Sequence, residues 1–272
     1  MPRTVRHKKR SSERPALTAK TRKRIRIALL GLVTVAVFVT GFWLYTEWRH
    51  YQRALRARFP QFGIAMPAHH TIHGIDVSRY QRYISWPAVS SMEVFGIKLG
   101  FCFIKATRGT GHTDPLFSRN WRKAKQAGLV RGAYHYFIPT QSGLEQARHF
   151  LRVVRFSKGD LPPVLDLEEV KGVSASQLRK EALVWLTTVE SATGIRPILY
   201  TNVGFYQRYL GRAFDVYPLW VAHYYQPRQP SIRRGWTFWQ HSDAGRVNGI
   251  EGPVDFNVFN GDSSAFRRIL IP

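Results

Sequence analysis

The hydrophobic pattern begins with one long apolar segment near the N-terminus. Residues 27–45 contain no charged side chain and are rich in Leu, Val, Ala and Phe. About twenty apolar residues cross the hydrocarbon core of a bilayer as a helix. Trp43, Tyr45 and Trp48 stand at the far end of the segment, where aromatic rings prefer the interface between membrane and water. We therefore predict one transmembrane helix over residues 27–46.

A cleaved signal peptide is the rival interpretation of this segment. The apolar region of a signal peptide usually has about 7–15 residues and ends in a small-residue cleavage site. Here the run is longer and ends in Gly-Phe-Trp-Leu-Tyr, without such a site. The pattern therefore favours an uncleaved anchor.

Charge on the two sides of the segment predicts its orientation. Residues 1–26 hold eleven Lys and Arg among many Ser, Thr and Pro, which is typical of a disordered tail. We expect residues 47–69 to form a linker or stalk. The helix-like stretch 47–58 within it carries four Arg, and it either lies along the lipid headgroups or forms a short stalk. Because positive flanks stay in the cytoplasm, we expect a single-pass protein of the cytoplasmic (inner) membrane with its N-terminus inside and its bulk in the periplasm or facing the cell wall.

From about residue 70 the pattern changes to short runs rich in β-branched and aromatic residues, which are typical of strands. Eight candidate strands follow one another: 71–77, 101–106, 131–137, 163–168, 197–202, 219–224, 237–242 and 254–259. Helical stretches separate the earlier ones: 86–94, 115–127, 143–154, 174–193 and 203–210. This alternation indicates parallel βα units. We predict an α/β fold over residues 70–272: an irregular, TIM-like (β/α) barrel of about eight strands with fewer helices. The Gly-rich loop 243–253 contains no helix, so the last strand is expected to be antiparallel.

Composition restricts the partners of this domain. The formal net charge is +24. Residues 1–58 contribute +13 of it and residues 59–272 contribute +11. A basic domain favours nucleic acid, anionic lipid or an acidic wall polymer, but we find no nucleic-acid-binding motif and predict no nucleic-acid partner. The one cysteine, Cys102, excludes an intramolecular disulfide and is expected to be a buried structural thiol.

Two acids end one of the apolar strands. Asp166 and Glu168 close the run Val-Leu-Asp-Leu-Glu, and their spacing of two residues places both side chains on one face of a strand. Carboxylates held close together raise the pKa of one of them, which keeps a proton available for general acid catalysis. The alternative is a strand end that frays into a solvated acidic turn.

Two further acids occupy similar positions. Asp76 ends the first strand and Asp255 opens the last one. If the last strand is antiparallel, its start lies at the same rim as the ends of the parallel strands, and that rim carries the active site in barrels of this kind. We therefore expect four carboxylates to converge on one face.

Aromatic side chains accompany these strand ends. The rings belong to Tyr134, Tyr136, Trp220, Tyr224 and Trp239. Sugars present apolar C–H faces that pack on rings, so a strip of rings beside carboxylates fits a polysaccharide cleft, whereas core packing is the competing explanation for some of them. None of the ten histidines has the spacing of a zinc protease motif, and no catalytic serine or phosphate-binding glycine motif is present. We predict no metal and no cofactor.

Residues 71–262 resemble glycoside hydrolase family 25, the Chalaropsis-type lysozymes. The matching segments follow in the family's order: His-Gly-Ile-Asp-Val-Ser (73–78) with Gln81 and Trp86, Phe-Ile-Lys-Ala-Thr (103–107), the stretch 114–137, Asp-Leu-Glu (166–168), Ile-Leu-Tyr-Thr-Asn (198–202), Leu-Trp-Val-Ala-His-Tyr (219–224), Trp-Gln (239–240) and Val-Asp-Phe-Asn (254–257). The resemblance implies muramidase activity, which cuts the β-1,4 bond between N-acetylmuramic acid and N-acetylglucosamine in peptidoglycan glycan strands, with retention of configuration.

The resemblance also implies roles for single residues. Glu168 matches the general acid/base. Asp166 matches its partner, either as nucleophile or as the group that orients the acetamido oxygen of the substrate. Asp76 and Asp255 match supporting acids, and Lys105 is expected to bind substrate with the rings. The sequence departs from the family at Arg108, where a Glu is common.

Other outcomes stay open at this point. We expect a monomeric catalytic domain that is anchored to the membrane through residues 27–46. A catalytically silent wall-binding or scaffold protein on the same fold is the alternative function, because a fold does not by itself imply an activity.

Overall fold

The computed structural model describes residues 19–67 and 69–272, and side chains are described for all of these except 52–58. The chain divides into two compact units, Met1–Ala54 and Leu55–Pro272. Most of the tail predicted over residues 1–26 lies outside the described residues.

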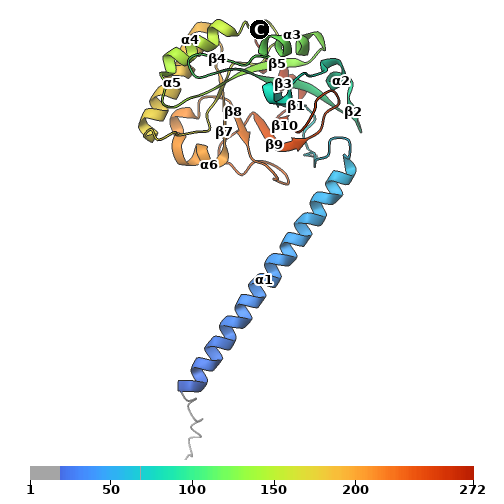
Figure 1. The fold of residues 1–272 in the computed structure, drawn as a ribbon, viewed down its shortest axis with the longest axis vertical. Coiled ribbons are helices and arrows are strands. Elements are labelled where there is room, and N and C mark those ends of the chain that lie inside the picture. Colours follow the sequence, from blue (N-terminus) through green and yellow to red (C-terminus); the bar gives the residue numbers. More distant parts are fainter. Residues whose placement is uncertain (1–18, 68) are drawn as a thin grey trace, which may run out of the picture. The chain divides into compact units, whose positions relative to one another are not determined.

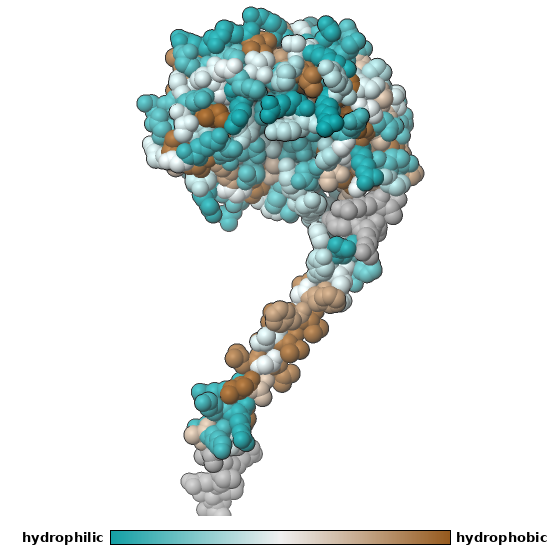
Figure 2. Space-filling view, in the orientation of Figure 1, coloured by the Kyte–Doolittle hydropathy of each residue, from teal (hydrophilic) through white to brown (hydrophobic). Residues whose placement is uncertain are grey.

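Most of helix α1, which runs from Ala19 to Arg58, belongs to the N-terminal unit. It begins eight residues before the predicted apolar segment, because residues 19–26 contain neither Pro nor Gly and are rich in Lys and Arg, which are good helix formers. The helix also continues through the stretch 47–58, as its pattern indicates. By length and composition, Ala19–Tyr51 is a candidate membrane span, and no part of its most apolar stretch is buried against the rest of the protein. The exposed apolar side chains of this stretch form the brown zone of α1 in Figure 2.

The second unit is a closed barrel. Its wall, within the described part of the chain, consists of β1 (His73–Val77), β3 (Ile97–Arg108), β5 (Val130–Tyr136), β6 (Val164–Asp166), β7 (Ile198–Asn202), β8 (Leu219–Ala222), β9 (Phe238–Gly245) and β10 (Val254–Phe259). Neighbouring strands pair in this order, and β10 pairs with β1 to close the ring. Within this ring of eight strands, all pairings are parallel except those of β10, which is antiparallel to both β9 and β1. The predicted fold class and the antiparallel last strand are therefore confirmed.

Helices surround this wall (Figure 1). They are α2 (Trp86–Ser91), α3 (Phe117–Gln126), α4 (Gly143–Val153), α5 (Ala175–Thr193), α6 (Val203–Phe205) and α7 (Ser263–Ile269), with short turns η1 (Arg79–Gln81), η2 (Tyr206–Leu210) and η3 (Arg212–Phe214). Two short strands, β2 (Glu93–Val94) and β4 (His112–Thr113), pair with β3. The sequence pattern did not predict α7, β2 or β4, because segments this short carry too few residues to show a period.

Alternation along the strands separates two cores. On β3, Phe101 and Phe103 point into the barrel, whereas Cys102 and Ile104 point outward to the helices. Cys102 is fully buried there, and burial raises the pKa of its thiol, in agreement with the structural role expected for it. Inside the barrel, the ring of Phe103 stacks on that of Trp220 with centroids 4.2 Å apart.

Glycine makes room for these rings. A Cβ atom on Gly132 would lie 2.5 Å from the ring of Phe103, and one on Gly74 would lie 2.5 Å from the ring of Phe101. These large rings fill the end of the barrel at which the parallel strands begin. The next inward position on each parallel strand therefore lies at the rim formed by the strands' C-terminal ends.

Candidate active site

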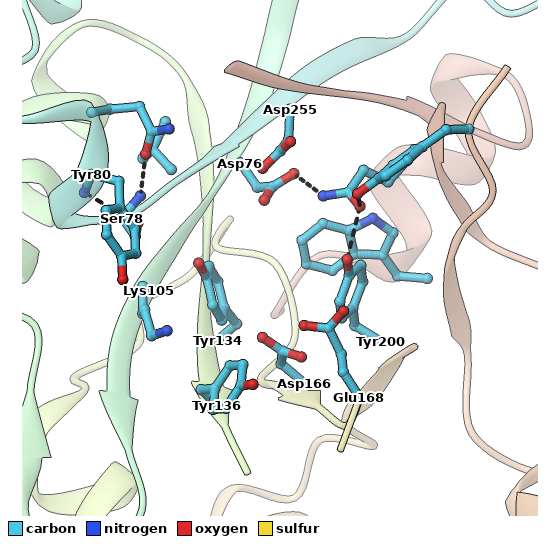
Figure 3. Close-up of a pocket in the computed structure, with 15 residues that line it drawn as sticks. Asp76, Ser78, Tyr80, Lys105, Tyr134, Tyr136, Asp166, Glu168, Tyr200 and Asp255 are labelled. Carbon is cyan, nitrogen blue, oxygen red and sulfur yellow. Dashed lines mark hydrogen bonds between the residues drawn. The ribbon is translucent and has the colours of Figure 1, made fainter. Parts of the chain in front are cut away.

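A pocket of about 250 Å³ opens at this rim (Figure 3). Nine of the ten residues predicted for the site line it: Asp76, Lys105, Tyr134, Tyr136, Asp166, Glu168, Trp220, Tyr224 and Asp255. They come from six different strands and the loops that follow them. Period-two alternation explains this convergence, because Lys105 lies two residues after the inward Phe103, and Asp166 two after the inward Val164.

Asp166 and Glu168 form the first pair of acids. Strand β6 ends at Asp166, so Glu168 lies in the loop just beyond the strand rather than on it as predicted. Both carboxyl groups nevertheless turn toward the same space (Figure 3). Asp166 is 5% exposed and Glu168 is partly buried. Burial raises the pKa of both groups.

This pair therefore holds a proton to higher pH than isolated carboxylates do. The negative charge of Glu168 adds to the effect of burial at Asp166. The Lys105 ammonium lowers the pKa of both groups in part. One oxygen of Asp166, Oδ1, is buried without a hydrogen-bond partner among the described residues, so it is available to accept from a bound molecule.

Asp76 and Asp255 form the second pair. They face each other across the antiparallel β1–β10 ladder. Burial raises the pKa of Asp76, and the charge of Asp255 raises it further. Burial also raises the pKa of Asp255, to about 6. Two acidic pairs with raised pKa values in one pocket are typical of a catalytic site rather than of a structural ion-pair network.

Amide side chains hold Asp76 in place. Its Oδ1 accepts from Gln240 Nε2 at 2.8 Å and from Asn257 Nδ2 at 2.7 Å. Gln240 Oε1 in turn accepts from the hydroxyls of Tyr200 and Tyr224, both at 2.8 Å. Because the phenols can donate to the amide oxygen, they fix the amide's orientation, and its nitrogen must then point at Asp76.

The aromatic residues have two different positions. Tyr134, Tyr136 and Tyr224 present their rings to the pocket, and Trp220 is buried beneath it with Nε1 donating to Asn257 Oδ1 at 2.8 Å. Trp239, which was predicted to contact substrate, does not line the pocket. It is fully buried on the outer face of β9, where Nε1 donates to the carbonyl of His223 at 2.8 Å. Its neighbour Gln240 has the inward position instead, because successive side chains on a strand point to opposite faces.

Lys105 connects the acids with the rings. Its Nζ lies 4.4 Å from the ring centroid of Tyr136 and 5.8 Å from that of Tyr134. Burial lowers the pKa of Lys105, and the charge of Asp166 opposes this effect. The ammonium is thus placed to interact with a substrate oxygen beside the acidic pair.

Sequence reasoning missed several lining residues. Tyr200 and Gln240 belong to the segments that carry the family resemblance, but no role was predicted for either. The signal that identifies them is alternation: Tyr200 lies two residues after the inward Ile198, and Gln240 two after the inward Phe238. Ser78, Tyr80 and Gln81 follow β1 and line the pocket as well.

Comparisons with known proteins agree with this geometry. The model of the Glycosyl hydrolases family 25 matches residues 75–250. The uncharacterized protein YegX of Escherichia coli (strain K12) is 50% identical over 235 residues, which cover 86% of both chains. Lysozyme M1 of Streptomyces globisporus is 36% identical over 208 residues, covering 71% of this chain and 69% of the relative.

A solved structure shows the same likeness. The family 25 glycosyl hydrolase from Bacillus anthracis has a TM-score of 0.69 at 32% identity, covering 75% of this chain and 95% of that one. The residues matched by the family model include Asp76, Asp166 and Glu168, whereas Asp255 lies just beyond them. The resemblance seen in the sequence is thereby confirmed, and the chain belongs to family 25 of the glycosyl hydrolases.

Proposed function

We propose that this protein is a lysozyme that hydrolyses the β-1,4 bond between N-acetylmuramic acid and N-acetylglucosamine in peptidoglycan. The observation that carries the proposal is the pair Asp166 and Glu168, one buried and one partly buried carboxyl group that share a pocket with tyrosine rings and a lysine. Membership of a glycosyl hydrolase family and the similarity to lysozyme M1 support it.

Glu168 acts as the acid. Its raised pKa lets it keep a proton, which it gives to the glycosidic oxygen as the bond to the sugar C1 breaks. Two alternatives exist for the attack on C1: attack by Asp166, and attack by the acetamido oxygen of the substrate itself. Asp166 Oδ1 is a buried acceptor without a partner among the described residues, which favours substrate assistance because such an acceptor can orient the acetamido group.

In the substrate-assisted path the acetamido oxygen of the same sugar attacks C1. Asp166 Oδ1, a buried acceptor without a partner in the described residues, accepts from the acetamido N–H and orients that group. Glu168, now a carboxylate, takes a proton from water as the water opens the cyclic intermediate. Two inversions at C1 give net retention.

Release of soluble fragments from purified peptidoglycan tests the proposal. We expect Glu168→Gln to slow release by about 10²–10⁴-fold, the usual contribution of a general acid. Glu145→Gln is the matched control, since Glu145 is exposed on α4 and its carboxylate pairs, among the described residues, with the exposed Arg148. Equal release by the wild type and Glu168→Gln, with both folded, would instead favour a protein that binds the wall without cutting it.

Helix α1 supports a second part of the proposal, that the enzyme is anchored in the cytoplasmic membrane with residues 1–26 inside and the barrel outside. Eleven Lys and Arg precede the apolar segment and four follow it within residues 47–58. A single cysteine introduced at an exposed barrel position, such as Ser264, should react with a membrane-impermeant maleimide in intact spheroplasts. The native Cys102 is fully buried and adds little background. Labelling only after lysis would reverse the orientation, and a shortened mature chain would indicate a cleaved signal peptide.

A further inference from the structure

A second cavity, of about 370 Å³, adjoins the catalytic pocket. The two share Tyr80, Lys105 and Tyr136 as a common wall. Three cationic side chains line the second cavity, namely Arg79, Lys105 and Arg108. Because the two cavities meet at these three side chains, a substituent on a sugar bound beside Asp166 would extend past them into the second cavity.

The acids in the cavity already have partners. Asp114 is 4% exposed, and its two carboxylate oxygens accept from the backbone N–H groups of Arg79 and Leu116, each at 2.9 Å. Glu169 forms an ion pair with Lys171 at 2.8 Å and accepts from the Tyr136 hydroxyl at 2.5 Å. These bonds hold the loops, and the two carboxylates offset only part of the positive charge: Asp114 raises the pKa of Lys105, and Arg108 lowers the pKa of Glu169.

The cations have no such partners. Within the described ranges, no carboxylate lies within 4.0 Å of the side-chain nitrogens of Arg79, Lys105 or Arg108. Arg79 lies over the ring of Tyr80 at 5.4 Å, and Arg108 lies over that of Tyr136 at 5.6 Å. Burial lowers the pKa of Lys105, the charges of Asp166 and Asp114 raise it, and the charge of Arg108 lowers it again by a smaller effect. Like charges gathered in a partly enclosed cavity repel each other, and an anion would relieve that repulsion.

We propose that this cavity is an accessory subsite for a carboxylate carried by the muramoyl unit of the substrate, held by Arg79 and Arg108 with Lys105. The inference rests on the proposed lysozyme function. A neutral sugar needs acceptors as well as donors, whereas guanidinium groups offer only donors, in a planar arrangement that matches a carboxylate. Two sources supply this chemistry: the lactyl carboxylate of peptide-free muramic acid, and the free carboxylates of the attached stem peptide.

Four preparations of soluble glycan strands test the inference with the full-length protein in detergent. One carries stem peptides with free carboxylates, and one carries the same peptides with carboxylates converted to carboxamides. The other two are strands stripped by an amidase, with the lactyl carboxylate either free or converted to the amide. The readout is kcat/KM for the release of new reducing ends.

We expect the wild type to prefer one or both free-carboxylate strands over their amidated counterparts by about tenfold, the range of a charge-assisted pair on a half-exposed surface. The stripped and peptide-bearing arms identify which carboxylate is bound. The double variant Arg79→Gln/Arg108→Gln should reduce this preference to nearly one. Arg122→Gln, which removes an exposed charge on α3, should keep the wild-type preference.

Equal kcat/KM of the wild type on free and amidated strands would overturn the subsite while leaving the lysozyme function intact. The same holds if the double variant loses an equal factor on both kinds of strand, because that result indicates a general defect. Absence of new reducing ends from every preparation would overturn the proposed function, and the subsite with it.

Discussion

Asp255→Asn should stabilise the protein at neutral and alkaline pH and change its stability little at pH 3–4. Asp255 sits beside Asp76 in the pocket, and burial raises its pKa from 3.8 to about 6. A raised folded-state pKa means that the native protein binds this proton more tightly than the unfolded chain does. The folded state is therefore relatively favoured below pH 4, and this advantage is lost as the pH rises through about 6.

The size of the effect follows from the shift. One pKa unit corresponds to about 1.4 kcal/mol, so the shift amounts to up to about 3 kcal/mol of destabilisation above pH 7. Asn does not ionise, and its amide N–H can still donate to Asp76. For a domain of this size, 1 kcal/mol moves the melting temperature by about 2–4 °C, so the variant should melt up to about 10 °C higher at pH 8.

Thermal unfolding followed by tryptophan fluorescence from pH 4 to pH 8 measures this difference. The melting temperature of Asp255→Asn minus that of the wild type, ΔTm, should rise with pH across this range and become constant above pH 7. The lysozyme activity of the variant should fall, because Asp255 lines the catalytic pocket. A ΔTm that stays constant with pH, or a variant that melts lower at pH 8, would refute the reasoning from buried charge. Glu251→Gln is a suitable control, because Glu251 is exposed and lies outside the pocket.

Three other changes have defined outcomes. Gly132→Ala should cost about 1–3 kcal/mol in urea unfolding, because the new methyl group would meet the ring of Phe103 at 2.5 Å. Gln240→Leu should cost about 2–4 kcal/mol, because it leaves one buried and one partly buried phenol hydroxyl without their acceptor. Lys105→Met should move the alkaline limb of the pH profile of kcat to higher pH. The Lys105 ammonium partly offsets the effect of burial on the pKa of Glu168, so its removal should raise that pKa further.

Each of these has a result that contradicts it. Unchanged urea midpoints for Gly132→Ala would mean that the ring layer tolerates an extra methyl group. A Gln240→Leu variant as stable as the wild type would mean that the phenols find other partners. An alkaline limb that stays in place or moves down in Lys105→Met would mean that this lysine does not act electrostatically on the acid.

The sequence pattern predicted the barrel because each strand is short, apolar and followed by a helix or a turn. It predicted Asp76 and Asp166 in the pocket because both end strands whose C-terminal ends form the rim, whereas Lys105 was expected only from the family resemblance. The eight predicted strands lie within a few residues of the observed bounds, because each strand begins and ends where the sequence changes between apolar and polar residues.

The remaining features depend on register and on loops. Trp239 was assigned to the cleft because composition alone does not tell which face of β9 is inward, and the structure gives that position to Gln240. Glu168 reaches the pocket from a loop, where strand alternation makes no prediction. The pairing of Asp114 with the backbone of Arg79 joins segments 35 positions apart, a contact that no local pattern contains.

The most direct test of the central claim is the identity of the new chain ends. Digestion of purified peptidoglycan in H₂¹⁸O, followed by mass spectrometry of the products, should give muramic acid at the new reducing end with one ¹⁸O atom, and no such product from Glu168→Gln. Reducing-end N-acetylglucosamine or unlabelled anhydro-muramic acid would contradict the account, because the first requires cleavage of the other glycosidic bond and the second requires no water.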